Sequence, residues 1–443
     1  MRSKHAYWLL ALMLLACVVP GAAMASSARI QALGVQGDYV LDYANVPNYP
    51  SAIVRYQNLV YGDLGVKDDT DGNDDISDFQ DNAYNPALVG SGRAMGLLLG
   101  NLFGGKIGTL GIYLNENATP LSPALGAEYI NRNANESWNL VWGYKFSNMA
   151  LGLQINKSAA SYEDDEDKFA PYAGASPTID DVDFNARQIF NAIASNVGGS
   201  GWNSIGAGAG FSFDWGSEGR SNFADLGFAI RQYGYEETDK LTPYTDEDDD
   251  GLSFAVNARG HLETADAFHV VPVINFYTHD FSSQETDGTQ LTNKMDGLNI
   301  GLAGQWKLRE SDWLTAGVAF QSVSASFENP GGGPDAEMDY MTLPNVFAAL
   351  ESNLWSWFTL RLGASKPWYS KLTLKGGLED VVGGVGETEI QDSPFQYSVG
   401  AGFHFGRVDV DAVLNQDFAF SGSYMGSGNS ELPFTRLSAT YRW

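Results

Sequence analysis

Acidic side chains gather in two stretches whose spacing could bind a divalent cation. The first stretch places oxygen ligands at every second residue, with Asp69, Asp71, Asn73 and Asp75. The second stretch begins in the same way, with Asp246, Asp248 and Asp250. This is the spacing of calcium loops, but neither stretch reaches the glutamate that completes an EF-hand. Two interpretations stay open: solvated acidic loops, or sites that bind Ca²⁺ or Mg²⁺.

Histidine is the other residue type that could do chemistry. Of the five histidines, His261, His269, His279 and His404 point into the interior of a barrel by the strand phases described below. A lipid-acting serine hydrolase would need a Ser–His pair on a lipid-facing surface, and the sequence predicts none. His279 and Asp280 could serve a protease, but such a pair at a strand end is typical of the start of a solvated loop. We therefore expect no catalytic residues and no enzyme.

The charge balance excludes one class of partner. The chain of 443 residues has 26 Lys and Arg against 54 Asp and Glu, a net charge of −28. A nucleic-acid-binding face needs a positive field, so we expect no nucleic-acid partner. The acidic residues are concentrated in three segments: residues 62–91, 161–183 and 236–250 hold eight each.

Residues 1–25 have the pattern of a cleaved export signal. Arg2 and Lys4 precede an apolar run, and Ala23-Met24-Ala25 is a small-residue cleavage site. The only cysteine, Cys17, lies within this leader. We therefore expect an exported chain without disulfides or thiolate metal sites.

Strict alternation of apolar and polar residues defines the elements that must position these side chains. In the last strand, Leu437, Ala439 and Tyr441 share one face, whereas Arg436 and Ser438 share the other. A membrane barrel needs this period of two, with apolar side chains on lipid and small or polar ones in the lumen. The fold class is therefore all-β, a transmembrane antiparallel β-barrel over residues 53–443. The predicted strands are 53–61, 93–103, 106–115, 137–146, 149–157, 205–215, 222–233, 251–262, 267–279, 297–308, 312–327, 342–352, 356–366, 394–405, 407–418 and 433–443.

The connections between these strands alternate between short and long. Tight junctions such as Ser147-Asn148 and Gly406 alternate with long ones such as 62–92 and 234–250. Outer-membrane barrels have short periplasmic turns, long outer loops and an even strand number. Sixteen strands fit every junction, and fourteen is the alternative if the first strands are misassigned. The acidic segments all fall on the long-loop side.

The alternation assigns a charged set to the lumen. It comprises Arg55, Lys145, Asp225, Arg231, Arg259, Arg361, Asp409 and Asp411. Charges of both signs could be ion pairs that hold the wall to a plug, or a polar filter that selects solutes.

Residues 26–52 precede the first strand and do not alternate. They are either a periplasmic tail or a plug folded into the lumen. Ala32-Leu33-Gly34, Asp42 and the box Asn48-Tyr49-Pro50-Ser51 resemble the N-terminal stretch of the long-chain fatty-acid transporter family, whose box reads Asn-Pro-Ala. The resemblance implies an N-terminal hatch, fourteen strands and a similar mature length.

The expected function is therefore an outer-membrane channel for passive uptake of small solutes, hydrophobic ones if the hatch resemblance holds. The alternative is a structural or interaction barrel whose acidic surface loops bind cations. Expected partners are outer-membrane lipid, lipopolysaccharide and a small-molecule solute. The sequence does not give the solute or the oligomeric state.

Overall fold

The computed structural model describes residues 26–35, 37–65, 94–100, 102–115, 136–163, 197–216, 222–239, 244–265, 267–284, 290–327, 335–375, 388–393, 395–414 and 434–443. In these ranges, short helical turns precede eighteen strand segments. The helical turns are α2 (Ser27–Leu33), η1 (Gly37–Tyr39), η2 (Tyr43–Asn45) and η3 (Pro50–Arg55). The strands are β1 (Leu59–Gly65), β2 (Ala94–Leu99), β3 (Thr109–Asn115), β4 (Glu136–Phe146), β5 (Met149–Glu163), β6 (Val197–Trp215), β7 (Asn222–Asp239), β8 (Tyr244–Ala265), β9 (Phe268–Gln284), β10 (Gln290–Arg309), β11 (Asp312–Phe327), β12 (Ala336–Trp355), β13 (Phe358–Pro367), β14 (Ser370–Lys375), β15 (Thr388–Asp392), β16 (Gln396–Phe405), β17 (Val408–Leu414) and β18 (Phe434–Arg442).

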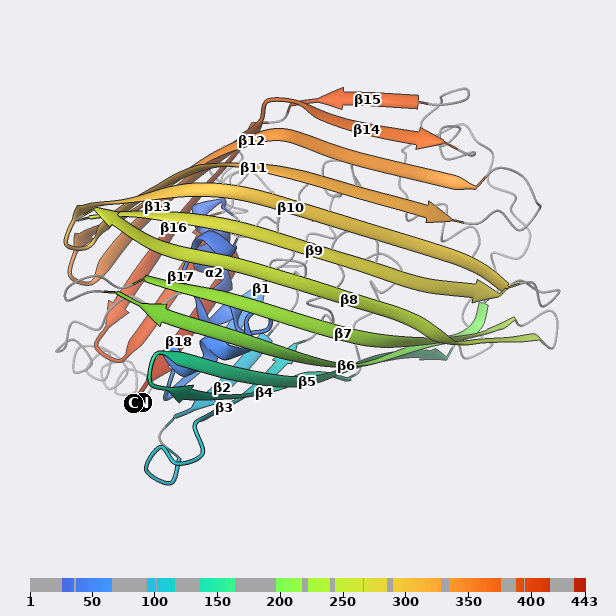
Figure 1. Cartoon of the computed structure of the whole chain (residues 1–443), viewed down its shortest axis with the longest axis horizontal. Coiled ribbons are helices and arrows are strands. Elements are labelled where there is room, and N and C mark those ends of the chain that lie inside the picture. The colour runs from blue at the N-terminus through green and yellow to red at the C-terminus, as the bar shows by residue number, and fades with distance from the viewer. Residues whose placement is uncertain are drawn as a thin grey trace, which may run out of the picture.

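All eighteen segments belong to one antiparallel sheet that closes on itself (Figure 1). β1 pairs with β2 on one side and with the last strand, β18, on the other. Closure gives the first and last strands a partner that an open sheet would leave missing. The molecule is therefore a β-barrel.

The eighteen segments make sixteen strands of the barrel, because two strands are each interrupted once. β12 pairs with β13 from Asn345 onward and with β14 before that. β13 and β14 are thus one strand, and β15 and β16 are the next, since they pair with β14 and β13 in turn. The interruption lies beside Pro344 and Pro367, where proline has no N–H to give to the sheet. The predicted sixteen-strand barrel is confirmed, and the fourteen strands that the resemblance implied are not formed.

Several predicted boundaries are wrong, because many strands extend into predicted loops and β14 and β15 lie within the predicted loop 367–393. Two cases show the causes. The first strand begins at Leu59 rather than at residue 53, because Pro50 starts the 3₁₀ turns of η3 and the chain becomes extended only at Tyr56. The stretch 234–250 is mostly strand rather than loop, since β7 continues to Asp239 and β8 begins at Tyr244. Backbone pairing does not depend on side-chain polarity, so this hairpin continues past the apolar part of its strands.

The outer face of the barrel is apolar. On β7, the exposed Leu226, Phe228 and Ile230 alternate with the buried Asp225 and Arg231. Aromatic rings gather near the short turns, where Trp355, Trp357, Phe358 and Phe403 contact one another. An apolar band bordered by aromatic residues is the surface of a barrel that spans a bilayer.

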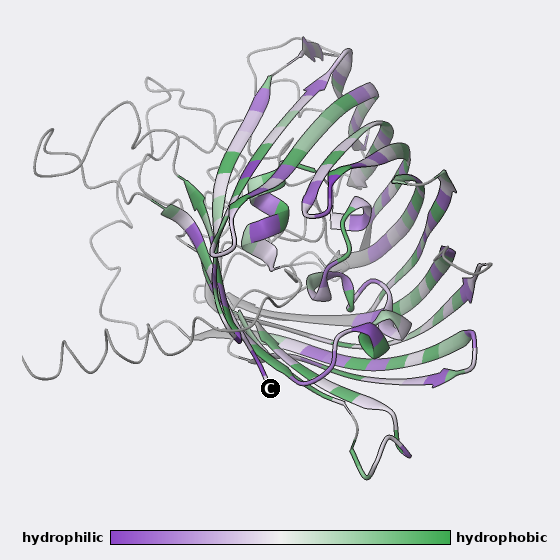
Figure 2. Cartoon of the chain, turned by 90° about the vertical axis from the view of Figure 1, so that its left-hand side faces the viewer, coloured by the Kyte–Doolittle hydropathy of each residue, from purple (hydrophilic) through white to green (hydrophobic). Residues whose placement is uncertain are grey.

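The N-terminal segment, residues 26–56, lies inside the barrel near its short-turn end (Figures 1 and 2). α2 contacts β12, β13, β16, β17 and β18, whereas η3 contacts β3 to β7. Because these two sets of strands lie in different parts of the wall, the segment crosses the lumen. Most of its side chains are buried, including Ile30, Tyr39 and Tyr43.

Among the described residues, no helix is both long and apolar enough to cross a membrane.

Candidate functional site

The N-terminal segment is shaped by its own capping residues. The Ser26 hydroxyl accepts a hydrogen bond from the Arg29 N–H at the start of α2, and Gly34 ends that helix with a left-handed φ of 57°. The Asp42 carboxylate accepts from the Ala44 N–H, 2.7 Å away, and begins η2. The amide of Asn45 donates to the carbonyls of Gly37 and Val40. These local bonds hold the segment in a compact path that fits the lumen.

Glycines in the wall make room for this segment. A Cβ added at Gly227 of β7 would overlap the Asn48 carbonyl oxygen, and one at Gly152 of β5 would overlap the backbone of Pro50. On the other side of the lumen, where α2 ends, a Cβ added at Gly363 of β13 would overlap the Leu33 carbonyl. The wall is therefore cut back where the backbone of the segment passes, which is a fit specific to this segment.

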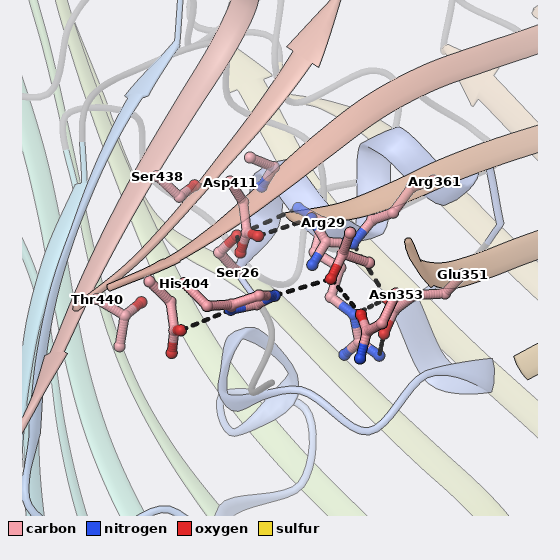
Figure 3. A network of polar contacts seen from close by, with 12 residues as sticks. Ser26, Arg29, Glu351, Asn353, Arg361, His404, Asp411, Ser438 and Thr440 are labelled. Carbon is pink, nitrogen blue, oxygen red and sulfur yellow. Dashed lines mark hydrogen bonds and ion pairs between the residues drawn. The ribbon is translucent and has the colours of Figure 1, made fainter. Parts of the chain in front are cut away.

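An ion-pair cluster ties α2 to the wall; we call it the Arg29 cluster (Figure 3). The Arg29 guanidinium donates to both carboxylate oxygens of Glu351, at 2.5 and 3.1 Å. Glu351 also accepts from Arg361 at 3.0 Å, and Arg361 donates to Asp411 at 2.6 Å. The Ser26 hydroxyl donates to the other oxygen of Asp411 at 2.7 Å. Two arginines and two carboxylates thus balance their charge in a buried chain.

A second cluster ties η3 to the opposite wall; we call it the Arg55 cluster. Arg55 donates to both oxygens of Asp225 at 2.8 Å each. Asp225 also accepts from Arg259 at 3.0 Å and from the Ser212 hydroxyl at 2.6 Å. The Ser51 and Ser212 hydroxyl oxygens lie 2.8 Å apart. Bidentate arginine–carboxylate pairs combine strength with a fixed geometry.

The middle of the segment is held by hydrogen bonds to inward polar side chains. Asn275 of β9 donates to the Asp38 carboxylate at 2.7 Å. Gln305 of β10 donates to the Tyr39 carbonyl at 2.6 Å, and Gln154 of β5 donates to the Pro47 carbonyl at 3.0 Å. Wall side chains thus satisfy backbone groups of the segment that would otherwise lie unpaired in a buried place.

Asp42 is a buried acid within the segment. Burial raises its pKa to about 7, although the Arg29 charge and the Ala44 N–H act in the opposite direction. Burial also raises the pKa of Asp38, which Arg259 and Asn275 partly offset. The buried Asp42 carboxyl therefore loses its proton near neutral pH.

A cavity of about 430 Å³ remains between the segment and strands β7 to β12. Leu33, Val40 and Leu41 line it from the segment, and His269 and Trp313 line it from the wall. The last two residues are the second residues of β9 and β11, each of which follows a short connection in the sequence. The cavity therefore belongs to the short-turn end of the lumen.

Within the described ranges, the hydroxyl–imidazole pairs of Ser253 with His279 and of Thr359 with His404 were not predicted from the sequence. The Ser253 hydroxyl and His279 Nδ1 lie 2.5 Å apart on β8 and β9. The Thr359 hydroxyl lies 2.8 Å from His404 Nε2, and His404 Nδ1 lies 2.8 Å from Asp409. Thr359 and Ser253 are 0% and 1% exposed, so neither hydroxyl is open to a substrate. We interpret both pairs as cross-strand bonds of the wall.

The structure places the eight predicted lumen-lining residues as follows. Six are buried on inward faces of the wall, namely Asp225, Arg231, Arg259, Arg361, Asp409 and Asp411. Lys145 is half exposed beside Asp214, 2.7 Å away, next to the turn at Ser147. The placement of Arg55 on a wall strand is wrong, because it lies on η3 and faces the wall from inside.

The sequence reasoning missed Arg29 and Glu351. The alternation of β12 could have revealed Glu351, since Asn345, Phe347 and Ala349 share its buried face. Arg29 gave no signal, because the position of a helical turn inside the lumen does not follow from a strand pattern.

The predicted cation sites have different outcomes. Asp69, Asp71, Asn73 and Asp75 lie outside the described residues. Asp246, Asp248 and Asp250 lie in β8 rather than in a loop, and Asp246 and Asp248 pair with residues of β7. In the part of the chain that the structure describes, no group of three or more His, Asp or Glu side chains is arranged to hold a metal ion. Cation binding at these residues stays a prediction.

Comparisons with known proteins give distant likenesses to outer-membrane proteins. No protein-family model and no curated protein matches the chain. The crystal structure of the Pseudomonas putida toluene transporter TodX is 10% identical, with 95% of this chain and 97% of that chain covered and a TM-score of 0.38. The ferric-catecholate import receptor Fiu from E. coli K12 is 8% identical, with 87% and 81% covered and a TM-score of 0.32. The siderophore receptor PirA from Acinetobacter baumannii is also 8% identical, with 87% and 80% covered and a TM-score of 0.27. At this level of similarity, none of them assigns a residue role or a solute to this chain.

Proposed function

We propose that this chain is an outer-membrane channel for the passive uptake of small solutes, with residues 26–56 as its gate. The proposal rests on how this segment is bound: it crosses the lumen and contacts both sides of the wall through the Arg29 and Arg55 clusters. A structural barrel has no need for a separate lumen element with its own charge-balanced contacts.

The ion pairs between the segment and the wall hold the segment in place but also allow it to leave. Arg29–Glu351 and Arg55–Asp225 each join the segment to the wall, whereas Arg361–Asp411 and Arg259–Asp225 lie within the wall. When the segment leaves, Glu351 and Asp225 keep an arginine partner each. The wall carboxylates therefore stay paired, which lowers the cost of opening because an unpaired buried charge is expensive.

The cavity beside the segment is suited to a small solute of low charge. The cavity between the segment and the wall combines apolar residues such as Leu33, Val40 and Phe223 with a few polar ones. Such a mixture is typical of small-molecule sites. We therefore propose that hydrophobic solutes are among those that pass through the channel.

A reversible lock tests the gate. Because the Ser51 and Ser212 hydroxyls lie 2.8 Å apart, the double variant Ser51→Cys and Ser212→Cys should form a disulfide between η3 and β6. The only natural cysteine is Cys17, so the two single variants are matched controls. We expect the oxidised double variant to lose solute flux into liposomes, and reductant to restore it.

Three outcomes separate the alternatives. Equal flux in the oxidised and reduced double variant would sink the gate while leaving the channel. No flux or conductance in any state, including a chain without residues 26–56, would overturn the channel and favour the structural or interaction barrel. Flux that falls on oxidation in a single-cysteine control would show that the loss is not due to the lock.

A further inference from the structure

The connection between β2 and β3 differs in composition from the rest of the barrel. Residues 94–115 contain a single charged residue, Lys106, in a chain with a net charge of −28. The part of the connection over residues 102–108, which we call the Phe103 turn, carries Phe103, whose side chain is 79% exposed. By contrast, the connection after β4 consists only of Ser147 and Asn148. An exposed apolar surface on a segment with so little charge is typical of an interaction site.

Glycines let the Phe103 turn bend back against the barrel wall. Phe103, Gly104, Gly105 and Gly108 all have left-handed φ angles, of 54°, 70°, 80° and 77°. Glycine adopts this conformation without steric cost, whereas a bulky aromatic residue rarely does. Gly108 is required for a second reason, because a Cβ added there would overlap the carbonyl oxygen of Gly143 on β4. The end of the turn therefore lies directly against β4, and its tip holds an aromatic residue in an unfavourable conformation.

Trp142 of β4 binds the end of the turn to the outside of the barrel. Trp142 belongs to the outer face, since it alternates with the inward Val141 and follows the exposed Leu140 by two residues. Its indole N–H donates to the Ile107 carbonyl, 2.7 Å away. Both views show the turn between β2 and β3 extending beyond the barrel wall (Figures 1 and 2). The Phe103 turn therefore lies on the lipid side of the wall and not below the lumen.

The Phe103 turn lies at the level of an aromatic border on the outer face. On β4, Trp142 contacts Tyr144 with ring centroids 6.3 Å apart, and Tyr144 contacts Phe146 at 4.7 Å. Aromatic residues near strand ends mark the boundary between hydrocarbon and water on a membrane barrel. Thr109, the first residue after the turn, lies opposite Gly143, the neighbour of Tyr144 in the chain. The turn therefore meets the wall at the depth of the lipid headgroups.

The apolar surface of the turn continues onto the barrel. Ile107 is 38% exposed, and Leu110, two residues after the turn, is 39% exposed. Leu99 and Leu110, which flank the turn, line an apolar groove of about 460 Å³ on the outer face. Since lipid covers this face, the lipid that fills the groove would also contact the turn. Lys106 is exposed between Phe103 and Ile107, where its ammonium group can bind lipid phosphates.

We infer that the Phe103 turn anchors the barrel in the bilayer leaflet at its short-turn end, with Phe103 and Ile107 among the acyl chains and Lys106 at the lipid phosphates. Removal of the Phe103 ring from water stabilises this arrangement and offsets the cost of its left-handed backbone. A turn in water would gain nothing from an aromatic residue at this position. The inference does not depend on the proposed function, since a barrel of any function could carry such an anchor.

Fluorescence quenching tests the depth of the turn. In a Cys17→Ser background, Phe103→Cys is labelled with an environment-sensitive nitrobenzoxadiazole dye, and the protein is folded into phosphatidylcholine nanodiscs. Glu310→Cys is the control, because Glu310 is exposed in the connection between β10 and β11. We expect lipid that is spin-labelled near its headgroup to quench the dye at position 103, and aqueous iodide to quench only the dye at position 310.

The folding equilibrium tests the side chains of the anchor. Urea titration from phosphatidylcholine vesicles should give an equilibrium constant for folding that is about tenfold smaller in Phe103→Ser, because a ring covered by lipid is lost. Phe103→Trp, which keeps an interfacial ring, should match the wild type. In vesicles that contain phosphatidylglycerol, Lys106→Glu should lower the constant about fivefold, and by less in pure phosphatidylcholine. Heat-modified gel migration checks that every variant is folded.

Each of three results would overturn the inference. Quenching by iodide at position 103 would place the turn in water. A dye at position 103 that neither agent quenches would indicate a protein contact, such as one with a second copy of the chain. An unchanged equilibrium constant in Phe103→Ser would show that no lipid covers the ring.

Discussion

The Arg29 cluster is a closed group of paired charges, and a single substitution breaks it. Arg361 is fully buried and donates to both Glu351 and Asp411. By contrast, Arg309 is 79% exposed and pairs with Asp312 at 3.5 Å. The two arginines therefore offer a matched comparison of a buried ion pair with a surface one.

Replacing Arg361 should be far more costly than replacing Arg309. We expect Arg361→Gln to lower the free energy of unfolding by about 3–5 kcal/mol, since two buried carboxylates lose a charged partner. Arg309→Gln should change it by less than about 0.5 kcal/mol, because water screens an exposed pair. Guanidinium titration of tryptophan fluorescence in lipid vesicles measures both. Similar losses in the two variants would contradict the role of the Arg29 cluster.

Asp42 should make the segment sensitive to pH. Its pKa in the folded chain, about 7, lies above its ordinary value of 3.8, so folding favours the protonated carboxyl. The stabilising contribution is complete below about pH 4 and is lost as the pH rises to about 7. Asp42→Asn keeps an oxygen for the Ala44 N–H and never ionises.

We therefore expect Asp42→Asn and the wild type to be equally stable near pH 4. Above pH 7 the variant should be more stable by roughly 2–4 kcal/mol. Unfolding titrations at pH 4, 5.5, 7 and 8 measure the difference. A difference that does not grow with pH would show that Asp42 is ionised throughout.

At the scale of the elements, the backbone of the segment and the inner face of the wall are complementary. Gly227 and Gly152 lie where Asn48 and Pro50 pass, so any side chain there would displace η3. Gly62 of β1 is a matched control, because nothing lies within 4 Å of the position of its added Cβ. Both Gly227 and Gly62 lie within strands, so the intrinsic effect of alanine on the backbone is similar.

Gly227→Ala should release η3 from the wall. In a Ser51→Cys background, we expect the thiol to be protected from maleimide in the parent protein, since Ser51 is fully buried. Gly227→Ala should raise the labelling rate at least tenfold, whereas Gly62→Ala should leave it unchanged. Equal labelling of the two glycine variants would argue against a close fit between η3 and β7.

The whole molecule divides its polarity between an apolar outside and a charged inside. Phe228 lies midway along the apolar part of β7, between the exposed Leu226 and Ile230. The acid in the sequence is also divided, since Asp63 belongs to the buried wall and accepts from the Ser27 hydroxyl at 2.5 Å. The net charge of −28 is therefore not a property of the long connections alone.

A charge on the outer face should be costly only if lipid covers it. We expect Phe228→Arg to lower the free energy of unfolding from phospholipid vesicles by about 2–4 kcal/mol, the cost of a basic residue near the bilayer midplane. Phe228→Leu, the control, should cost less than about 1.5 kcal/mol. Guanidinium titration from vesicles measures both. If arginine were no worse than leucine, β7 would not face lipid at this depth.

How much of the structure can be predicted from the sequence depends on the range of the interactions. Alternation of side chains is a local property with a period of two, so it predicted sixteen strands and the inward faces of Asp225, Arg259 and Arg361 correctly. It failed at residues 53–58, where a proline-initiated turn has no period, and at 234–250, where the strands extend beyond the apolar belt. The arrangement of Arg29 against Glu351 joins residues 322 positions apart, and no local pattern encodes such a distance.

The sequence by itself determined the barrel, because closing an alternating sheet is the way to satisfy both its backbone and its two unlike faces. Only the tertiary structure decided what fills the lumen. The segment 26–56 is placed by shape, where glycines open the wall, and by the pairing of Arg29 and Arg55 with carboxylates on opposite sides. Such pairings depend on which strands lie across the barrel from one another, and that relation exists only once the barrel has closed.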